Sequence, residues 1–275
     1  MSYNFTKEQI ENAFNQTQTA IGAAKLLGIK IDTYKKYAER FGCYKTNQSG
    51  KGLKKSRTFV EPTDINIHYF DNLSTNSQAY VLGFISADGT IKKNTLRFFI
   101  SNKDKEILEY ICSEMNIDKN KIIDYVGWYK KDEIRHEFPC SRLYITSKYM
   151  VNQLKEFGIE TNRVSNNINL LKNIPEQRKI SWLAGYLDGN GTFYKNNRRV
   201  EITTNNSTFE EIKKFLNQYD INEFKKRDFG KYITFRFSAN STFIRDYLSS
   251  NNFLLSRKSS MASMMLSRMI HKGKN

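Results

Sequence analysis

Two segments of the chain place an oxygen-bearing side chain at the same point of the same pattern. VLGFISADG (residues 81–89) and LAGYLDGNG (residues 183–191) are related by a shift of 102 residues. Each apolar run ends in a polar residue followed by glycine, Asp88 in the first and Asn190 in the second. A carboxylate can take part in acid–base or ligand chemistry, and a carboxamide offers a similar oxygen without the charge. Asp88 alone would be interpreted as an Asp-Gly turn, so the pairing is what suggests a site.

Small residues indicate that both segments are closely packed helices. Gly83 and Gly185 each begin a pair of small residues spaced four apart, which lie on one helix face. A glycine inside a helix costs roughly 1 kcal/mol, so it is expected where another backbone must come very close. We therefore expect Gly83 and Gly185 to form a helix interface, with a pseudo-twofold axis that brings Asp88 and Asn190 side by side.

The repeat extends beyond the two segments. Arg97 and Phe98 correspond to Arg199 and Val200 at the same shift. The strand after each helix therefore keeps one alternation of core-facing and outward residues, and two copies of one structural unit are expected.

The paired segments closely resemble the two motifs of single-chain LAGLIDADG homing endonucleases, and the resemblance covers about residues 77–267. It implies an α+β fold of two pseudo-symmetric αββαββα repeats whose strands form an antiparallel saddle. It also implies hydrolysis of phosphodiesters in both DNA strands with a divalent metal. Mg2+ is the usual ion, with Mn2+ or Ca2+ as possible substitutes, because carboxylates suit hard cations.

The same resemblance implies roles for individual residues. Asp88 matches the acidic residue that binds metal and is catalytic. Asn190 holds the equivalent second position, where it supplies one neutral oxygen and no charge. Asp188 does not replace it, because two positions along a helix it points roughly 200° away. The backbone carbonyls of Ala87 and Gly189 are further metal ligands by resemblance. Basic residues at the centre would come from the start of the last helix of each repeat, and the candidates are Lys258, taken as catalytic, Arg257 and Arg163.

Alternation within the predicted strands separates a core face from a DNA-binding face. Ile233, Phe235 and Phe237 are predicted to point inward, as are Leu143 and Ile145, which leaves the residues between them outward. Arg can pair with guanine and Glu can accept from cytosine, although a solvated sheet face would look the same. The strands are expected at 96–101, 124–129, 142–146, 199–204, 224–228 and 232–238. The predicted DNA-binding residues on them are Arg97, Arg142, Tyr144, Arg199, Glu201, Thr203, Tyr232, Thr234 and Arg236.

Residues 1–42 are predicted to form a small all-α helix-turn-helix domain. Thr6 caps its first helix, Gly28 ends its second, and the third buries Tyr37 and Phe41. A helical hairpin that packs on its neighbour is the alternative, and the basic linker that follows favours DNA. The predicted contacts are Thr33, Lys35, Lys36 and Arg40 in the third helix and Lys51, Lys54, Lys55 and Arg57 in the linker.

The charge of the chain indicates a polyanionic partner. Lys and Arg outnumber Asp and Glu by 44 to 28, a formal charge of +16. Residues 43–60 and the segment after Asp246 both carry cations and no acid, so we expect them to bind phosphate instead of packing on the core. The few, scattered Cys and His residues exclude a disulfide framework and a zinc site. Because the sequence shows no long apolar run and no signal region, we expect an intracellular, non-secreted protein without a membrane partner.

These observations predict four parts and one partner. The parts are a helix-turn-helix domain (1–42), a basic flexible linker (43–64), repeat 1 (65–172) and repeat 2 with a basic C-terminal tail (173–275). We expect a monomer that cuts double-stranded DNA at a long, asymmetric site, as an intron-homing enzyme of a mobile element does. The alternatives are a repressor-like DNA-binding protein without catalysis, which Asn190 favours, and an intron RNA-splicing maturase, which shares the motifs.

Overall fold

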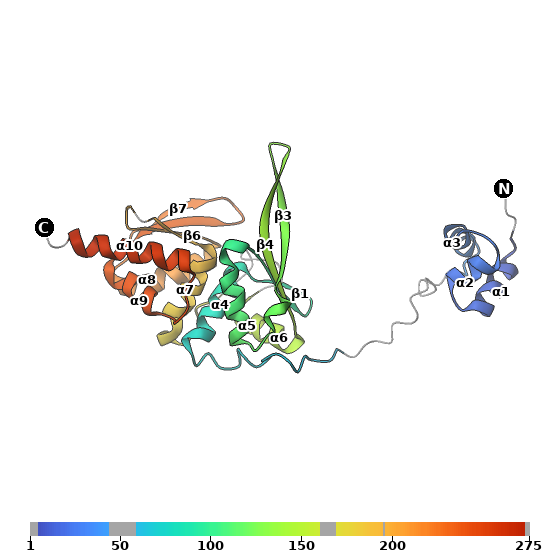
Figure 1. Ribbon diagram of the computed structural model, residues 1–275, viewed down its shortest axis with the longest axis horizontal. Helices are drawn as coiled ribbons and strands as arrows, with labels where there is room; N and C mark the ends of the chain where they lie inside the picture. The colour runs from blue at the N-terminus through green and yellow to red at the C-terminus, as the bar shows by residue number, and fades with distance from the viewer. Residues whose placement is uncertain (1–4, 44–58, 160–168, 195, 273–275) are drawn as a thin grey trace. The chain divides into compact units, whose positions relative to one another are not determined.

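The computed structural model describes residues 5–43, 59–159, 169–194 and 196–272 (Figure 1). The chain divides into two compact units, residues 1–59 and 60–275. Within the described ranges, no helix is both long enough and apolar enough to cross a membrane.

The first unit contains α1 (Lys7–Thr17), α2 (Ala20–Leu26) and α3 (Ile31–Arg40). As predicted, Thr6 caps α1: its side chain accepts from the backbone N–H of Gln9, and its own N–H donates to the Gln9 side chain. Gly28, with φ of 64°, makes the left-handed turn that follows α2. A short connection, residues 27–30, joins α2 to α3, and the helix-turn-helix assignment stays a prediction.

The prediction that Tyr37 and Phe41 are buried is wrong, because both rings are only half-buried. Tyr37 packs edge-on against Phe5 and stacks on Phe41, so the three rings cover the edge of the domain. The interior of this small unit is filled instead by alanines around Ile10 and Tyr34.

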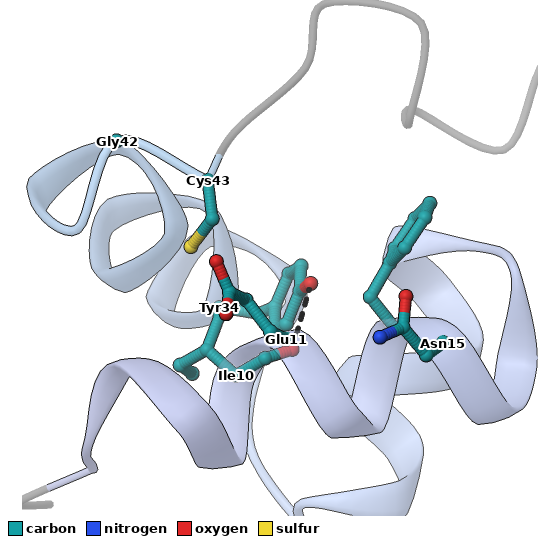
Figure 2. Close-up of a pocket in the computed structure, with 7 residues that line it drawn as sticks. Ile10, Glu11, Asn15, Tyr34, Gly42 and Cys43 are labelled. Carbon is teal, nitrogen blue, oxygen red and sulfur yellow. Dashed lines mark hydrogen bonds between the residues drawn. The ribbon is translucent and has the colours of Figure 1, made fainter.

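A pocket of about 300 Å³ opens in the first unit between α1 and the end of α3 (Figure 2). Tyr34, one of the lining residues, donates its hydroxyl hydrogen bond to the carbonyl oxygen of Ile10 (3.4 Å). Burial, with the Glu11 carboxylate second, raises the pKa of the Cys43 thiol. The thiol is therefore protonated at neutral pH and is not an activated nucleophile.

The second unit consists of two repeats of one αββαββα pattern. Repeat 1 contains α4 (Asn76–Asp88), β1 (Thr90–Lys92), β2 (Thr95–Ser101), α5 (Lys105–Glu114), β3 (Ile123–Lys131), β4 (Ile134–Thr146) and α6 (Lys148–Glu156). Repeat 2 contains α7 (Lys179–Asn190), β5 (Gly191–Tyr194), β6 (Arg199–Thr204), α8 (Asn206–Leu216), β7 (Lys225–Asp228), β8 (Ile233–Ser238) and α9 (Ser241–Ser249), followed by α10 (Ser256–Lys272). The two antiparallel sheets have the equivalent orders β1-β2-β4-β3 and β5-β6-β8-β7. The α+β fold of two matching repeats is as predicted.

The hairpins that complete the two sheets differ in length. Strands β3 and β4 have 9 and 13 residues, whereas β7 and β8 have 4 and 6. The β3–β4 hairpin projects from the rest of its sheet (Figure 1). The sequence prediction began the second strand at Arg142, eight residues too late, because Pro139 and the charges before it interrupt the alternation. Pro139 is tolerated because β4 pairs there with β3 alone.

The basic C-terminal segment forms a helix that packs on the core. The expectation that this segment stays unpacked until it binds phosphate is therefore wrong. Helix α10 buries Ala262, Met265 and Met269 in the core of the second unit. These side chains recur at helical spacing, and the polar residues between them obscured the stripe in the sequence.

Helices α4 and α7 approach each other so closely that neither crossing point has room for a side chain. A Cβ added at Gly83 would lie 1.9 Å from the carbonyl oxygen of Trp182, and one at Gly185 would lie 1.9 Å from that of Tyr80. Both helices are buried on nearly all sides, and each leads directly into the first strand of its sheet.

We expect Gly83→Ala to destabilise the second unit by about 3 kcal/mol or more, because the methyl group would meet a backbone atom that cannot move aside. Gly230→Ala, in the β7–β8 turn, is the matched control. Its φ is 80° and no atom lies within 4 Å of an added Cβ, so it should cost only about 1–2 kcal/mol. Urea unfolding followed by tryptophan fluorescence measures both, and equal losses would contradict the close contact.

Candidate active site and nucleic-acid face

The acidic end of α4 and the amide end of α7 lie against each other. Asn190 Nδ2 donates to the carbonyl oxygen of Ala87 (3.4 Å). A Cβ added at Gly189 would lie 3.2 Å from Asp88 Oδ2. Asp88 therefore reaches across to the last turn of the other helix, at a position where a larger residue would crowd it. The following residues enter β1 and β5, so the pair lies where the two helices meet the sheets.

The Asp88 carboxylate is half-buried and accepts no hydrogen bond from the described part of the chain. Burial raises its pKa to about 6, and the Asp104 carboxylate acts in the same direction. The ammonium of Lys258 and the guanidinium of Arg257 lower it. At neutral pH Asp88 is thus an ionised carboxylate without a direct partner among the described residues, which favours the binding of a cation.

The oxygen atoms around Asp88 fit a hard divalent cation. Described residues form no cluster of three His, Cys, Asp or Glu side chains. The two helix ends therefore offer the Asp88 carboxylate, with the amide of Asn190 beside the carbonyl of Ala87. The carbonyls of Ala87 and Gly189 stay predicted ligands. Mg2+ suits this set, because it keeps several waters and shares its coordination shell with substrate phosphates. Zinc, which takes nitrogen and sulfur ligands, does not.

Asn190 keeps the two helix ends together without repulsion. Its amide lies beside Ala87 and interacts with the buried hydroxyl of Tyr186, which also bonds Thr204 (2.7 Å). An aspartate here would bring a second negative charge next to Asp88. Neighbouring carboxylates raise each other's pKa. Compared with an aspartate at this position, the amide of Asn190 therefore supplies no charged metal ligand, and it avoids the repulsion with Asp88.

Lys258, predicted as catalytic, is buried with 4% of its surface exposed. Its Nζ donates to the carbonyl oxygens of Leu187 (3.3 Å) and Gly191. These carbonyls belong to the C-terminal end of α7, so the ammonium caps that helix. Burial lowers the pKa of Lys258 to about 8. Its charge acts on Asp88, while its hydrogen bonds go to the backbone.

Arg257 joins the two repeats beside this site. Its Nε lies 2.5 Å from Asp104 Oδ1, and a terminal nitrogen lies 2.7 Å from Oδ2. Asp104 belongs to repeat 1 and Arg257 to repeat 2. A guanidinium has five N–H donors, so three remain beyond this pair, and the side chain is 49% exposed. Arg163 lies outside the described residues.

Asp188 points away from the candidate site, in agreement with the sequence argument. It accepts hydrogen bonds from the hydroxyls of Tyr80 (2.5 Å) and Tyr247 (2.7 Å) and from the backbone N–H of Leu255 (2.8 Å). Burial raises its pKa to about 6, although all three hydrogen bonds lower it. Asp188 thus fixes the segment that leads into α10, and with it Arg257.

The outward faces of both sheets carry the predicted residues. Ile233, Phe235, Phe237, Leu143 and Ile145 are buried as predicted. The predicted outward residues are half-buried or exposed, and contacts within and between strands order them. These contacts are Arg97 over the Tyr144 ring (5.4 Å), Arg142 over the Tyr144 ring (5.6 Å), the Glu201–Arg236 ion pair and the Thr203–Thr234 hydrogen bond (3.4 Å), with Arg199 and Tyr232 on the same surface.

Sequence reasoning missed four side chains of this surface. Phe99 pairs with Arg142, and Tyr125 lies beneath its guanidinium (5.5 Å). On the basic strand β7, Lys225 pairs with Arg236 of β8 and Arg227 pairs with Thr234 of β8. The register with neighbouring strands assigns them to this face. The sequence of β7, KKRD, does not predict this register, because its three successive cations hide the alternation of inward and outward side chains.

The predicted contacts of the first unit are unevenly exposed. On α3, Lys36 and Arg40 are exposed, whereas Thr33 and Lys35 are half-buried. The linker residues Lys51, Lys54, Lys55 and Arg57 lie outside the described residues.

Comparisons with known proteins give structural likeness only. No protein-family model matches the chain, and no curated protein matches it. Among solved structures with a similar fold, the LAGLIDADG homing endonuclease I-LtrWI bound to target DNA is 13% identical, with 76% of this chain and 92% of that chain covered and a TM-score of 0.45. I-SmaMI, bound to an uncleaved DNA target with calcium ions, is 13% identical, with 72% and 92% covered and a TM-score of 0.42.

Full-length DUF199/WhiA from Thermatoga maritima is also similar. It is 12% identical, with 74% of this chain and 65% of that chain covered and a TM-score of 0.42. These likenesses are distant, and the functional proposal below rests on the residues of this chain.

We expect Asp88→Asn to stabilise the second unit at pH 7.5 and not at pH 4. The raised pKa of Asp88 means that its ionisation opposes folding, a cost that accumulates as pH rises from about 4 to about 6 and stays constant above. The uncharged amide avoids it. Urea midpoints in EDTA at the two pH values measure the difference.

Asp64→Asn is the matched control, because the hydrogen bond from Lys121 lowers the pKa of Asp64. Its substitution should therefore fail to stabilise at pH 7.5. If Asp88→Asn gives no gain there either, the Asp88 carboxylate is not in the environment described.

Proposed function

We propose that this protein is a divalent-metal-dependent DNA endonuclease that binds duplex DNA across its two sheets. The observation that carries the proposal is the meeting of the two motif helices. It leaves the Asp88 carboxylate unpaired within the described part of the chain, at the point where a surface of Arg, Tyr and Thr side chains begins. Such a surface suits the major groove, and the position of Asp88 suits a phosphate between the two half-sites.

Asp88 would hold the metal, with Ala87 and Gly189 carbonyls as neutral ligands. A bound divalent ion would activate water and neutralise the leaving oxygen. Lys258 and Arg257 oppose the effect of burial on Asp88 and so keep it ionised at neutral pH. The free donors of Arg257 can bind a phosphate oxygen near Asp88. Mg2+ is the proposed ion, with Mn2+ or Ca2+ as substitutes.

The proposed DNA partner is long and asymmetric. Both repeats lie in one chain, so a monomer presents two unlike half-surfaces and its site need not be palindromic. The first unit would add a second contact through the exposed cations of α3, with the basic linker 43–64 between them. An intracellular location and intron homing belong to this proposal.

Asn190 favours a second candidate, a sequence-specific DNA-binding protein that does not cut. With one carboxylate in place of two, metal binding on the Asn190 side should be weak. The two candidates share the binding surface and differ only in chemistry. An RNA-splicing maturase is a third outcome, distinguished by tighter binding to a structured intron RNA than to duplex DNA at equal salt.

The test is Asn190→Asp on a supercoiled plasmid that carries a duplex selected from a random library. We expect the natural chain to bind this duplex and to nick it slowly, on one strand. Asn190→Asp should accelerate linearisation in Mg2+ by orders of magnitude, since a charged metal ligand contributes several kcal/mol to such barriers. Asp88→Asn in the Asn190→Asp background should abolish cutting and keep the affinity.

Equal linearisation rates for the natural chain and Asn190→Asp would remove Asn190 from the catalytic position. Specific binding without cutting by either protein would favour the second candidate. Asp64→Asn, which alters an exposed ion pair with Lys121, controls for an unspecific loss of charge.

A further inference from the structure

The two hairpins that end the sheets occupy equivalent places but differ in chemistry. The outward strip of β7–β8 is cationic: Lys225 and Arg227 are exposed and have no hydrogen-bond or ion-pair partner in the described chain. The β3–β4 hairpin, by contrast, carries four acids against three cations over residues 124–139. Although the protein has a net charge of +16, the β3–β4 hairpin has no excess of cations with which to bind phosphate.

The outer part of the β3–β4 hairpin is a free two-stranded ribbon. Strand β2 pairs with β4 only from Cys140 to Thr146, so among the described strands only β3 pairs with residues 134–139. Large apolar side chains nevertheless remain exposed there, including Ile134 at 62% and Tyr129 at 51%. A two-stranded ribbon is marginal in water by itself, and an exposed apolar strip on it indicates a binding surface.

The register assigns one strip to the proposed DNA face. Tyr129 pairs with His136, and Phe138 and Ile134 follow at the alternate positions of β4, in the same series as Arg142. The Tyr129 ring stacks on His136 (5.2 Å) and lies 5.8 Å from Phe138. The strip therefore continues the Arg142 surface outward as an aromatic and aliphatic one. We call Tyr129, Ile134, His136 and Phe138 the ribbon strip.

We propose that the ribbon strip binds thymine methyl groups in the major groove at the outer end of one half-site, while Lys225 and Arg227 hold phosphates at the other end. This inference rests on the proposed function. The major groove admits a two-stranded ribbon, and the thymine methyl is the apolar group that base edges present there. Tyr129, Ile134 and Phe138 match that group, and they lack the forked donors that select guanine or adenine.

Trp128, on the opposite face of the ribbon, supplies the matched control. It pairs with Glu137, and Arg135 covers its ring (5.3 Å) and forms an ion pair with Glu137 (2.8 Å). Trp128→Thr removes a large exposed aromatic side chain from the same ribbon without altering the strip. Threonine keeps the preference for a strand in each substitution.

The experiment compares the selected duplex with versions in which thymine is replaced by deoxyuridine, which removes only the methyl group. We expect selection to enrich A·T pairs at one outer end, and each deoxyuridine there to weaken binding roughly fourfold, the effect of one buried methyl. The Tyr129→Thr/Ile134→Thr/Phe138→Thr variant should lose this sensitivity, whereas Trp128→Thr should keep it.

The opposite end should respond to charge. Deoxyuridine there should have no effect, and Lys225→Gln/Arg227→Gln should reduce the slope of log K against log salt by about 2. The inference is overturned by a selected site without outer thymines, by deoxyuridine effects that the triple variant retains, or by a ribbon strip that instead mediates self-association in sedimentation. In each case specific duplex binding would stand, whereas failure to select any duplex would defeat the proposed function itself.

Discussion

The contact between α4 and α7 controls the geometry of the second unit. At Gly83 and Gly185 each helix backbone lies against a carbonyl of the other, so the distance between the helices is set by atoms that cannot be displaced. Because each helix runs straight into a strand, the same contact fixes where the two sheets begin and brings Asp88 against Gly189. The site depends on this packing more than on any bond made by the site residues themselves.

Charge placement is the second constraint, and it works against stability. Burial opposes ionisation of both Asp88 and Asp188, but their surroundings differ. Asp188 accepts three hydrogen bonds and serves the architecture, whereas Asp88 accepts none from the residues that the structure describes. A carboxylate held at a cost to stability, with cations nearby but not in contact, is typical of a functional site. At the end of α7, Asn190 avoids the stability cost of a second buried carboxylate, but it supplies no charged ligand.

Much of this arrangement was predictable from periodicity. The spacing of Gly83 and Gly185 and the repeat at 102 residues predicted the helix pair, and strand alternation predicted the inward-facing residues. The αββαββα pattern came from the resemblance to LAGLIDADG homing endonucleases. What the sequence did not predict depended on distant contacts. The burial of Lys258 follows from carbonyls on α7, 67 to 71 residues away, and the length of β4 follows from its pairing with β3. Local sequence carries no signal of either, just as the three cations of β7 hid Lys225 and Arg227 from the prediction.

The most direct test of the account is the position of Mn2+, located by its anomalous X-ray scattering in crystals of the protein with its selected duplex. The account predicts one strong Mn2+ site at the Asp88 carboxylate, between the two motif helices and beside a central phosphate, and weaker or no occupancy at Asn190. A complex in which Mn2+ avoids Asp88, or in which the duplex lies away from the two sheets, would contradict it.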